Sequence, residues 1–380
     1  MNVSPQNTSE RPGLLRGLGL WAAVAVVIGD TIGSGIFLVP SAMAAIVGSE
    51  SLVFAAWVVG GLIVLCGAFC YAELGATFPK AGGPYAYLNN GLGPLWGFLF
   101  GWMSAFLERP VAMATLAAGF ARFLGFLFPA VGTILAVLAA LVPAMWAYNG
   151  FNDLGHLGEE VIDAHKNIPR AILIGLGTIG VLYLLANAVY FRVLSFGAVA
   201  ASTHVASDAI QTFAGQSGAR ALTLAMAISA LGALHVVVMT GARIPYAMAR
   251  DGVFFSFASR LQPKLRTPSG SLLFLGVVAT LLALSGTYEQ LYSLFVFALW
   301  IFMGLTAIAL LRLRWTKPAL ERPFRAWAYP LTPLVFLAAA IALTVSLWLS
   351  RPIRSSLGLL VILAGVPFYY RWRSRSSQNI

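Results

Sequence analysis

Apolar residues occur along this chain in long runs that are separated by short polar segments. A helix needs about 20 mainly apolar residues to cross the hydrocarbon core of a bilayer, and several runs reach that length. The pattern predicts an all-α membrane protein with about ten transmembrane helices. The predicted helices cover residues 17–46, 51–79, 95–128, 132–154, 168–192, 219–250, 269–284, 288–313, 329–350 and 355–372.

The overall composition supports this interpretation. Apolar and aromatic residues make up 59% of the 380 residues and charged residues only 10%, against roughly 45–50% and 25% in soluble domains. A water-soluble fold of this size has no core large enough to bury so much apolar surface. Arg11 and Arg16 precede the first run, and no small-residue cleavage site follows it, so no removable signal peptide is expected.

The net charge is +11, and the positions of the basic residues along the chain bear on partner and topology. The basic residues are scattered over the polar segments and form no aromatic-interleaved stripe, so no nucleic acid partner is expected. Lys and Arg favour the cytoplasmic side of membrane proteins, and placing both termini there puts most of the 24 basic residues on that side. This predicts a multi-pass protein of the cytoplasmic (inner) membrane. Residues 17–372 would form one transmembrane domain between cytoplasmic tails at 1–16 and 373–380.

The first apolar run is interrupted at membrane depth by the sequence DTIGSGIF at 30–37. An interrupted helix is tolerated there only where it is buried in protein or lines a cavity. Glycine lowers the cost of leaving helical geometry at Gly33 and Gly35. A half-helix that begins at Gly35 or Ile36 points free N–H groups and the positive end of its dipole at an anion. The interruption therefore predicts a carboxylate site made mostly of backbone.

A second interruption lies in the fourth run, where the sequence WAYNGFND occupies positions 146–153. A broken helix here frees backbone carbonyl groups that attract an ammonium group. The two interruptions together predict a site for the carboxylate and the amine of one zwitterion. The alternative is that these Gly and Ser residues only allow helices to pack closely, for which small residues are common in membranes.

Short motifs are spread in order along nearly the whole chain. They include IGSGIF at 32–37, YAELG at 71–75 and PKAGGPYAYL at 79–88. These motifs resemble the amino acid–polyamine–organocation transporter family. A second group resembles the L-type amino acid transporter branch of that family and its bacterial relatives: WAYNG at 146–150, EEV at 159–161, NIPRA at 167–171, RIPYAMARDG at 243–252 and RPF at 322–324.

The resemblance implies a five-plus-five inverted-repeat fold with two trailing helices, a midplane site between broken helices one and six, and alternating access. The carboxylate of an amino acid would meet the Ser34 hydroxyl and the backbone amides after it. Its amine would meet carbonyl groups of Thr31, Trp146 and Asn149, and Trp146 would also close over the substrate. The expected substrate-binding residues are Thr31, Ile32, Gly33, Ser34, Gly35, Ile36, Trp146, Ala147, Asn149 and Gly150.

The chain departs from the family after the third run. Family members have twelve helices, whereas here the third run passes with hardly a loop into the run that resembles the sixth helix. Helices four and five of the family therefore have no counterpart, and an even number of missing helices preserves the orientation of the later ones. This leaves an incomplete first repeat at 17–128, a second-repeat side at 132–313 and trailing helices at 329–372. The family's fifth helix also carries a lysine that acts in place of a sodium ion, and nothing here matches it.

Two acidic residues lie near the predicted site. Asp30 stands about one turn before the glycines, and Glu108 lies beside Arg109 in the third run. An ionised acid at membrane depth costs at least about 2.5 kcal/mol. Each acid is therefore a candidate for carrying a coupling proton or contacting a substrate side chain, the alternative being a structural hydrogen bond. Adjacent residues do not face each other on an α-helix, so Glu108 and Arg109 each need another partner.

No phosphate-binding Gly-Lys motif, HExxH motif or G-x-S-x-G sequence occurs, so no enzyme activity, cofactor or metal is expected. Cys66 and Cys70 lie inside one apolar run, which argues against a disulfide-linked partner. The sequence predicts a secondary transporter, a permease or exchanger, that moves a small neutral amino acid, with a counter-transported amino acid or a proton as coupling. The alternative is a shortened chain that no longer transports and retains at most amino acid binding or a scaffold role.

Overall fold

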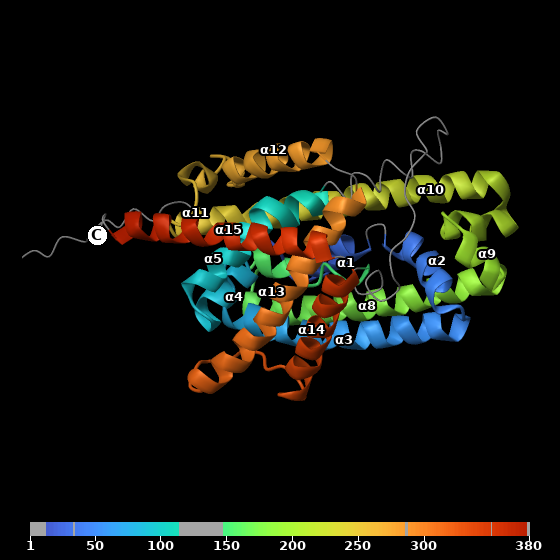
Figure 1. The fold of residues 1–380 in the computed structure, drawn as a ribbon, viewed down its shortest axis with the longest axis horizontal. Helices are drawn as coiled ribbons and strands as arrows, with labels where there is room; N and C mark the ends of the chain where they lie inside the picture. The colour runs from blue at the N-terminus through green and yellow to red at the C-terminus, as the bar shows by residue number, and fades with distance from the viewer. Residues whose placement is uncertain (1–12, 33–34, 114–146, 286–287, 351, 378–380) are drawn as a thin grey trace, which may run out of the picture.

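The computed structural model describes residues 13–32, 35–113, 147–285, 288–350 and 352–377, which are mainly helical (Figure 1). Two isolated β-bridges, Leu18 with Val161 and Ala81 with Leu157, are the β-type pairings found in these ranges. The all-helical fold predicted from the apolar runs is therefore confirmed.

The first part of the described chain contains long and short helices in alternation. They are α1 (Leu20–Thr31), α2 (Gly35–Val47), α3 (Glu50–Thr77), α4 (Pro84–Gly91), α5 (Pro94–Met103) and the π-helical turn η1 (Ser104–Glu108), after which the helix continues to residue 113. Such π-helical turns are rare and are frequently found at functional sites.

The second part begins with a turn at residues 148–152 and a short 3-10 helix. Its elements are η3 (Asp153–His156), α8 (Ala164–Val193), α9 (Phe196–Ala201), α10 (Val205–Gly241), α11 (Arg243–Arg250), η4 (Ser256–Ser259), α12 (Ser269–Ser285), α13 (Tyr288–Thr316), α14 (Leu331–Ser350) and α15 (Pro352–Ser377).

Six helical stretches of the described chain are long and apolar enough to cross a membrane. They cover Glu50–Thr77, Ala164–Val193, Val205–Arg250, Val296–Thr316, Leu331–Ser350 and Pro352–Ser374. Helices α1 and α12 are apolar but shorter. Most of the predicted helix 132–154 lies outside the described residues, so the total of ten spans stays a prediction.

Several elements differ from the helices expected from sequence. The short helices α4 and α9 were not predicted, because neither is long enough to register as an apolar span. The helix predicted to begin at residue 219 is preceded by a further helical stretch in α10, which departs from helical geometry only at Gly215 (φ +63°). That stretch is polar enough to escape a search for apolar runs, and Asp208 in its first turn favours a helix N-terminus.

Two of the long helices pack closely against α1. Helices α3 and α8 lie side by side (Figure 1), and α1 packs against α8 and α10. Helix α1 comes close to α8 at Gly175, since a Cβ at this position would lie 2.6 Å from Cγ1 of Val27. Small residues allow this kind of backbone approach in membrane proteins, and here they bring the end of α1 within reach of α8 side chains.

A buried carboxylate connects α3 to the segment between α13 and α14. Glu73 accepts hydrogen bonds from Arg314 Nε at 2.9 Å and Nη2 at 2.5 Å, and from the backbone amide of Ala326 at 2.7 Å. Arg322 Nε lies 3.4 Å from Oε1 of the same carboxylate. The guanidinium of Arg314 also stacks over the ring of Tyr329, 4.1 Å from its centroid. One acid therefore organises the whole connection between these helices.

Candidate functional site

The end of α1 and the turn at residues 147–150 are in direct contact. Gly150 has a φ of +128°, which favours glycine. A side chain here would also collide with α1, because a Cβ would lie 2.6 Å from Thr31 Oγ1 and 2.9 Å from the Thr31 backbone nitrogen. Glycine therefore lets the turn pack against α1, and the two segments that the sequence marks as interruptions are neighbours in space.

Tyr183 of α8 connects these two segments. Its hydroxyl oxygen lies 2.9 Å from the carbonyl oxygen of Thr31 and 2.7 Å from that of Ala147. A phenol has one proton to donate, so the two carbonyl groups share it. The rings of Trp57 and Tyr148 fix the tyrosine, with centroids 5.1 Å from its own. Tyr183 was not predicted, because one tyrosine in a long apolar run gives no sign of the carbonyl groups it meets.

The other predicted binding residues surround this contact. The carbonyl of Ile32 accepts a hydrogen bond from Ser229 of α10 at 3.3 Å. Gly35 begins α2, and Ile36 is buried beside it. Within the described residues, the buried Oδ1 atom of Asn149 has no hydrogen-bond partner. The remaining predicted residues, Gly33, Ser34 and Trp146, lie outside the described residues.

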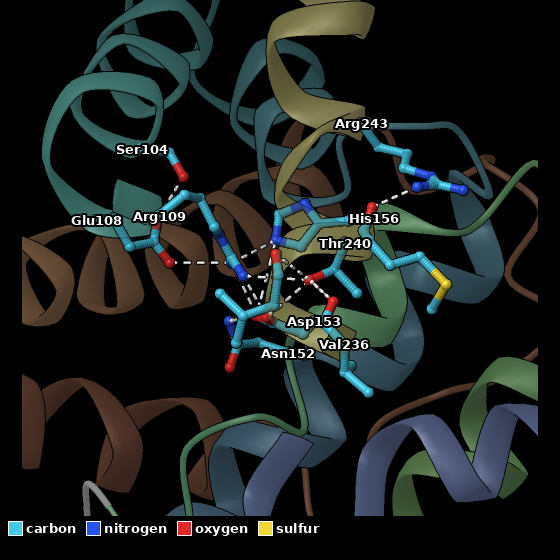
Figure 2. Close-up of polar contacts among 11 residues, drawn as sticks. Ser104, Glu108, Arg109, Asn152, Asp153, His156, Val236, Thr240 and Arg243 are labelled. Carbon is cyan, nitrogen blue, oxygen red and sulfur yellow. Dashed lines mark hydrogen bonds and ion pairs between the residues drawn. The ribbon is translucent and has the colours of Figure 1, made fainter. Parts of the chain in front are cut away.

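A second group of buried polar side chains surrounds Arg109, which directly follows the π-helical turn (Figure 2). Its guanidinium contacts both carboxylate oxygens of Asp153 in η3, Oδ1 through Nη2 at 2.8 Å and Oδ2 through Nη1. The Thr240 hydroxyl of α10 has one proton to donate and lies 3.2 Å from Asp153 Oδ2 and 3.0 Å from the carbonyl oxygen of Val236. The Asn152 amide donates to Asp153 Oδ1 at 2.9 Å. Arg109 is 2% exposed and Asp153 3%. This is a buried, bidentate and hydrogen-bonded ion pair, a geometry that compensates the loss of hydration.

Glu108 belongs to the same cluster. One of its carboxylate oxygens lies 3.0 Å from Arg109 Nη2, and the other accepts a hydrogen bond from Ser104. Each of the adjacent residues has a further partner, as predicted, but they also contact each other, which an ordinary α-helix does not favour. The two residues lie at the end of the π-helical turn, which departs from α-helical geometry, and their long side chains converge there (Figure 2).

His156 and Asp30 complete the cluster from two other elements. His156 Nε2 lies 2.9 Å from Arg109 Nη2, and its ring stacks against Phe100. Because a guanidinium only donates hydrogen bonds, this imidazole nitrogen must accept one, so the ring is neutral. The Asp30 carboxyl group, at the end of α1, lies against that of Asp153. Both acids singled out from sequence therefore meet around Arg109, whereas His156 was not predicted.

One end of the helical assembly is closed by ion pairs and backbone contacts. Arg243 binds Glu160 through Nε at 2.7 Å and Nη2 at 2.8 Å. The backbone amides of residues 17 and 18 donate to the Glu160 carbonyl, each at 2.9 Å. Arg250 pairs with Glu159 at 2.9 Å. These contacts link the N-terminal segment, the segment after η3 and α11.

A tyrosine–aspartate hydrogen bond reinforces the same end. The Tyr85 hydroxyl of α4 donates to Asp251 Oδ2 at 2.6 Å. Burial and the neighbouring Asp251 carboxylate raise the pKa of the Tyr85 phenol, so the hydroxyl keeps its proton and remains the donor. Hydrogen bonds and ion pairs therefore join the N-terminal segment, the segment after η3, α4 and the end of α11 at one end of the molecule.

These features define a class of protein. Within the described residues, no group of three or more His, Cys, Asp or Glu side chains is placed to hold a metal ion. The buried polar groups of the described residues include helix ends, carbonyls and charged clusters around Arg109 and Glu73, which sit among helices long enough to cross a membrane several times. A polar interior of this kind is characteristic of a multi-pass membrane transporter.

Comparison with known sequences identifies the transporter family. The amino acid permease family matches residues 18–138 and 129–366. The chain therefore belongs to the amino acid permease family, whose members are transporters and not enzymes.

Curated relatives cover most of the chain. The Asc-type amino acid transporter 1 of Mus musculus is 28% identical over 97% of this chain and 83% of its own length. The large neutral amino acids transporter small subunit 2 of Homo sapiens is 29% identical over the same shares. The b(0,+)-type amino acid transporter 1 of Rattus norvegicus is 27% identical over 100% of this chain and 93% of its own length. All three are amino acid transporters by name.

Proposed function

We propose that this chain is a secondary transporter that moves a small neutral amino acid across the cytoplasmic membrane by alternating access. The observation that carries the proposal is the meeting of α1 with the turn at 147–150, where Tyr183 contacts the carbonyls of Thr31 and Ala147. A site made of backbone groups from two chain interruptions recognises the carboxylate and amine that all amino acids share. The relative whose name includes neutral amino acids supports the substrate class.

Within this proposal, the substrate carboxylate meets the Ser34 hydroxyl and the amides of Gly35 and Ile36. The amine meets the carbonyls of Thr31, Trp146 and Asn149. Ile32, Gly33, Ala147 and Gly150 provide the backbone turns that expose these groups.

The missing family helices four and five form part of the proposal. The alignment with the mouse relative runs over 446 residues, more than the 380 of this chain, so that relative has segments with no counterpart here. The two matches to the permease family also overlap at residues 129–138, from the end of the third predicted helix into the start of the fourth. We propose that the first repeat, 17–128, keeps three helices, that the second-repeat side runs over 132–313, and that the trailing helices are at 329–372.

The proposed orientation places both termini, 1–16 and 373–380, in the cytoplasm. The contacts at the closed end support it, since they join Arg16, Arg243 and Arg250 to residues 159–160. Each of these arginines lies in a segment that the positive-inside rule assigns to the cytoplasm.

Binding is tested by measuring the thermal stability of the detergent-purified chain with each of the twenty amino acids. A ligand at 100 times its Kd raises the stability of the folded state by about 2.7 kcal/mol. We expect stabilisation by a subset of small neutral amino acids and its loss in Gly35→Leu. Gly177→Leu is the matched control, because a side chain at this α8 position meets nothing within 4 Å.

Transport is tested separately in proteoliposomes. Radiolabelled amino acids that stabilise the chain are expected to enter vesicles and to exchange with unlabelled amino acid inside. Binding without entry, together with entry in a version that has family helices four and five restored, would overturn transport by this chain. That result would support the alternative, a transport-incompetent form that retains only binding or a scaffold role.

A further inference from the structure

A pocket of about 220 Å³ lies between α3 and α8, which run side by side (Figure 1). The described residues that line it carry no charged side chain. An apolar cavity of about 150 Å³ is large enough to bind benzene, so this pocket has room for an aromatic molecule of one or two rings. Its walls include Trp57, Gly61 and Leu62 of α3, Gly180 and Leu184 of α8, and Tyr148 of the 147–150 turn.

The pocket opens toward the hydrocarbon core of the membrane. Val58 and Leu62 of its lining are 46% and 58% exposed, on a helix long and apolar enough to cross a bilayer. Gly61 lies about 17 Å along α3 from its first residue and about 24 Å from its last. The hydrocarbon core extends about 15 Å to either side of the bilayer centre, so the pocket lies far from both layers of head groups. A ligand therefore reaches it from the hydrocarbon region.

Glycines of α8 widen the pocket. Gly177 and Gly180 both line it, and a Cβ at either position would meet no atom within 4 Å. Gly175 of the same helix differs, because a Cβ there would press on Val27 of α1. Close helix packing therefore accounts for Gly175 and not for the other two. Since glycine destabilises a helix relative to alanine, what these two residues contribute is open space.

Two polar groups in the pocket wall have no hydrogen-bond partner within the described chain. The Tyr148 side chain is 2% exposed, and its hydroxyl makes no hydrogen bond to any described residue. This hydroxyl borders the pocket at Gly61, 3.2 Å from where a Cβ of that glycine would lie. The buried Nε1 of Trp57 also lacks a partner among these residues. Unpaired buried donors are costly, so a ligand with a hydrogen-bonding oxygen suits the pocket better than a hydrocarbon chain.

The pocket is connected to the proposed substrate site through aromatic rings. The ring of Tyr148 lies 5.6 Å from that of Trp57 and 5.1 Å from that of Tyr183, measured between centroids. The Tyr183 hydroxyl in turn contacts the carbonyls of Thr31 and Ala147. A molecule in the pocket therefore packs against a residue of the same turn that carries the proposed binding carbonyls.

We propose that this pocket binds a neutral aromatic alcohol dissolved in the bilayer, and that its occupancy slows amino acid exchange. The aromatic ring of the ligand packs against Trp57 and Tyr148. Its hydroxyl pairs with the hydroxyl of Tyr148, which can donate or accept. A filled pocket holds the Tyr148 ring, and with it the 147–150 turn, in the arrangement seen here. The effect on exchange rests on the proposed function, whereas the binding does not.

Binding is measured with 2-naphthol and the full chain in lipid nanodiscs, with empty nanodiscs as the blank for partitioning into lipid. We expect saturable binding of one molecule per chain, detected by naphthol fluorescence. Naphthalene has the same rings without the hydroxyl, so it should bind about two- to tenfold more weakly. Tyr148→Phe removes only the protein's hydroxyl and should make the two ligands bind alike. Equal affinities for the native chain, or no saturable binding, would overturn the proposal.

A second variant tests the location. Gly180→Leu puts a side chain into the pocket and is expected to weaken 2-naphthol binding by at least about tenfold. Gly276→Leu on α12 is the matched control, because this exposed glycine also has no atom within 4 Å of an added Cβ and should bind like the native chain. Melting temperatures show that the variants are folded. Native-like binding by Gly180→Leu would overturn the assignment to this pocket.

Exchange in proteoliposomes distinguishes failure of this inference from failure of the proposed function. We expect saturating 2-naphthol to lower the maximal exchange rate of the native chain severalfold and to leave that of Gly180→Leu unchanged. Equal inhibition of both would point to a general effect on the bilayer and overturn the coupling. Absence of exchange by a native chain that still binds 2-naphthol would overturn the proposed function and leave the binding site in place.

Discussion

The hydroxyl of Tyr183 lies 2.9 Å from the carbonyl oxygen of Thr31, 152 residues earlier in the chain. The same hydroxyl is 2.7 Å from the carbonyl of Ala147. One side chain of α8 therefore holds the end of α1 and the beginning of the turn at 147–150 at a fixed separation. Any substrate that uses these carbonyl groups competes with, or is positioned by, this phenol.

Tyr183→Phe is expected to weaken amino acid binding by about two- to tenfold. Removing the hydroxyl takes one hydrogen bond, with a net contribution of about 0.5–1.5 kcal/mol, from two buried carbonyl groups. Equilibrium binding of labelled amino acid to the purified variant checks this. Tyr190→Phe, the same change on the same helix, is the control and should bind like the native chain. Equal effects of the two substitutions would contradict the role given to Tyr183.

Gly150→Ala is expected to weaken binding by at least about tenfold and to lower the melting temperature. The positive φ is strained for alanine, at about 1–3 kcal/mol, and the new Cβ would press on Thr31. Melting of the purified protein and titration with amino acid measure both effects. Gly177→Ala, in open space on α8, should melt at the native temperature or slightly above it. Normal binding by Gly150→Ala would show that the turn and α1 are not in tight contact.

Arg109→Met is expected to destabilise the chain strongly, by about 3–5 kcal/mol, because it leaves Asp153 buried without its cation. Asp153→Leu alone should be comparably harmful. Combining the two removes the whole pair, so the double variant should be more stable than the sum of the single effects indicates. A double-mutant cycle of thermal stabilities provides the measurement. Strictly additive losses would mean that the two residues do not act as a pair.

The two ion pairs at the closed end, Arg243 with Glu160 and Arg250 with Glu159, are expected to contribute differently to holding that end together. Arg243, with a side chain 5% exposed, is buried against Glu160, whereas the side chain of Arg250 is 47% exposed. Exposed pairs contribute about 0–1 kcal/mol, so Arg250→Gln should change little. Arg243→Gln should loosen the closed end. Maleimide labelling of a cysteine introduced at Leu18, in a background without Cys66 and Cys70, should accelerate in Arg243→Gln and stay slow in Arg250→Gln. The reverse order would contradict this assignment.

The long helices could be predicted from sequence because a membrane leaves few choices. A run such as 51–79 must be helical to satisfy its backbone, and α3 spans Glu50–Thr77. The prediction for 168–192 agrees similarly with α8, Ala164–Val193. Short helices such as α4 were missed, since periodicity and length carry little information over eight residues.

The site was only partly predictable. Glycine-rich and polar interruptions indicate where an apolar run leaves helical geometry, and these interruptions are the reason that Thr31, Asn149 and Gly150 are among the predicted binding residues. Their partners come from distant parts of the chain, and nothing in the local pattern around Tyr183 or His156 indicates which groups they meet. Of the charge cluster, the sequence predicted two acidic residues near the site, Asp30 and Glu108. Its assembly around Arg109 depends on the π-helical turn, for which the sequence has no recognisable signal.

The carboxylate of Glu73 has a consequence for biosynthesis. It leaves the ribosome long before Arg314, Arg322 and the backbone amide of Ala326, its partners in the finished protein, which follow about 240–250 residues later. The early helices are therefore inserted with an unsatisfied acid, and the ribosome must nearly finish the chain before that acid is neutralised. A chain that ends before Arg314 would lack all three partners and leave this acid unpaired.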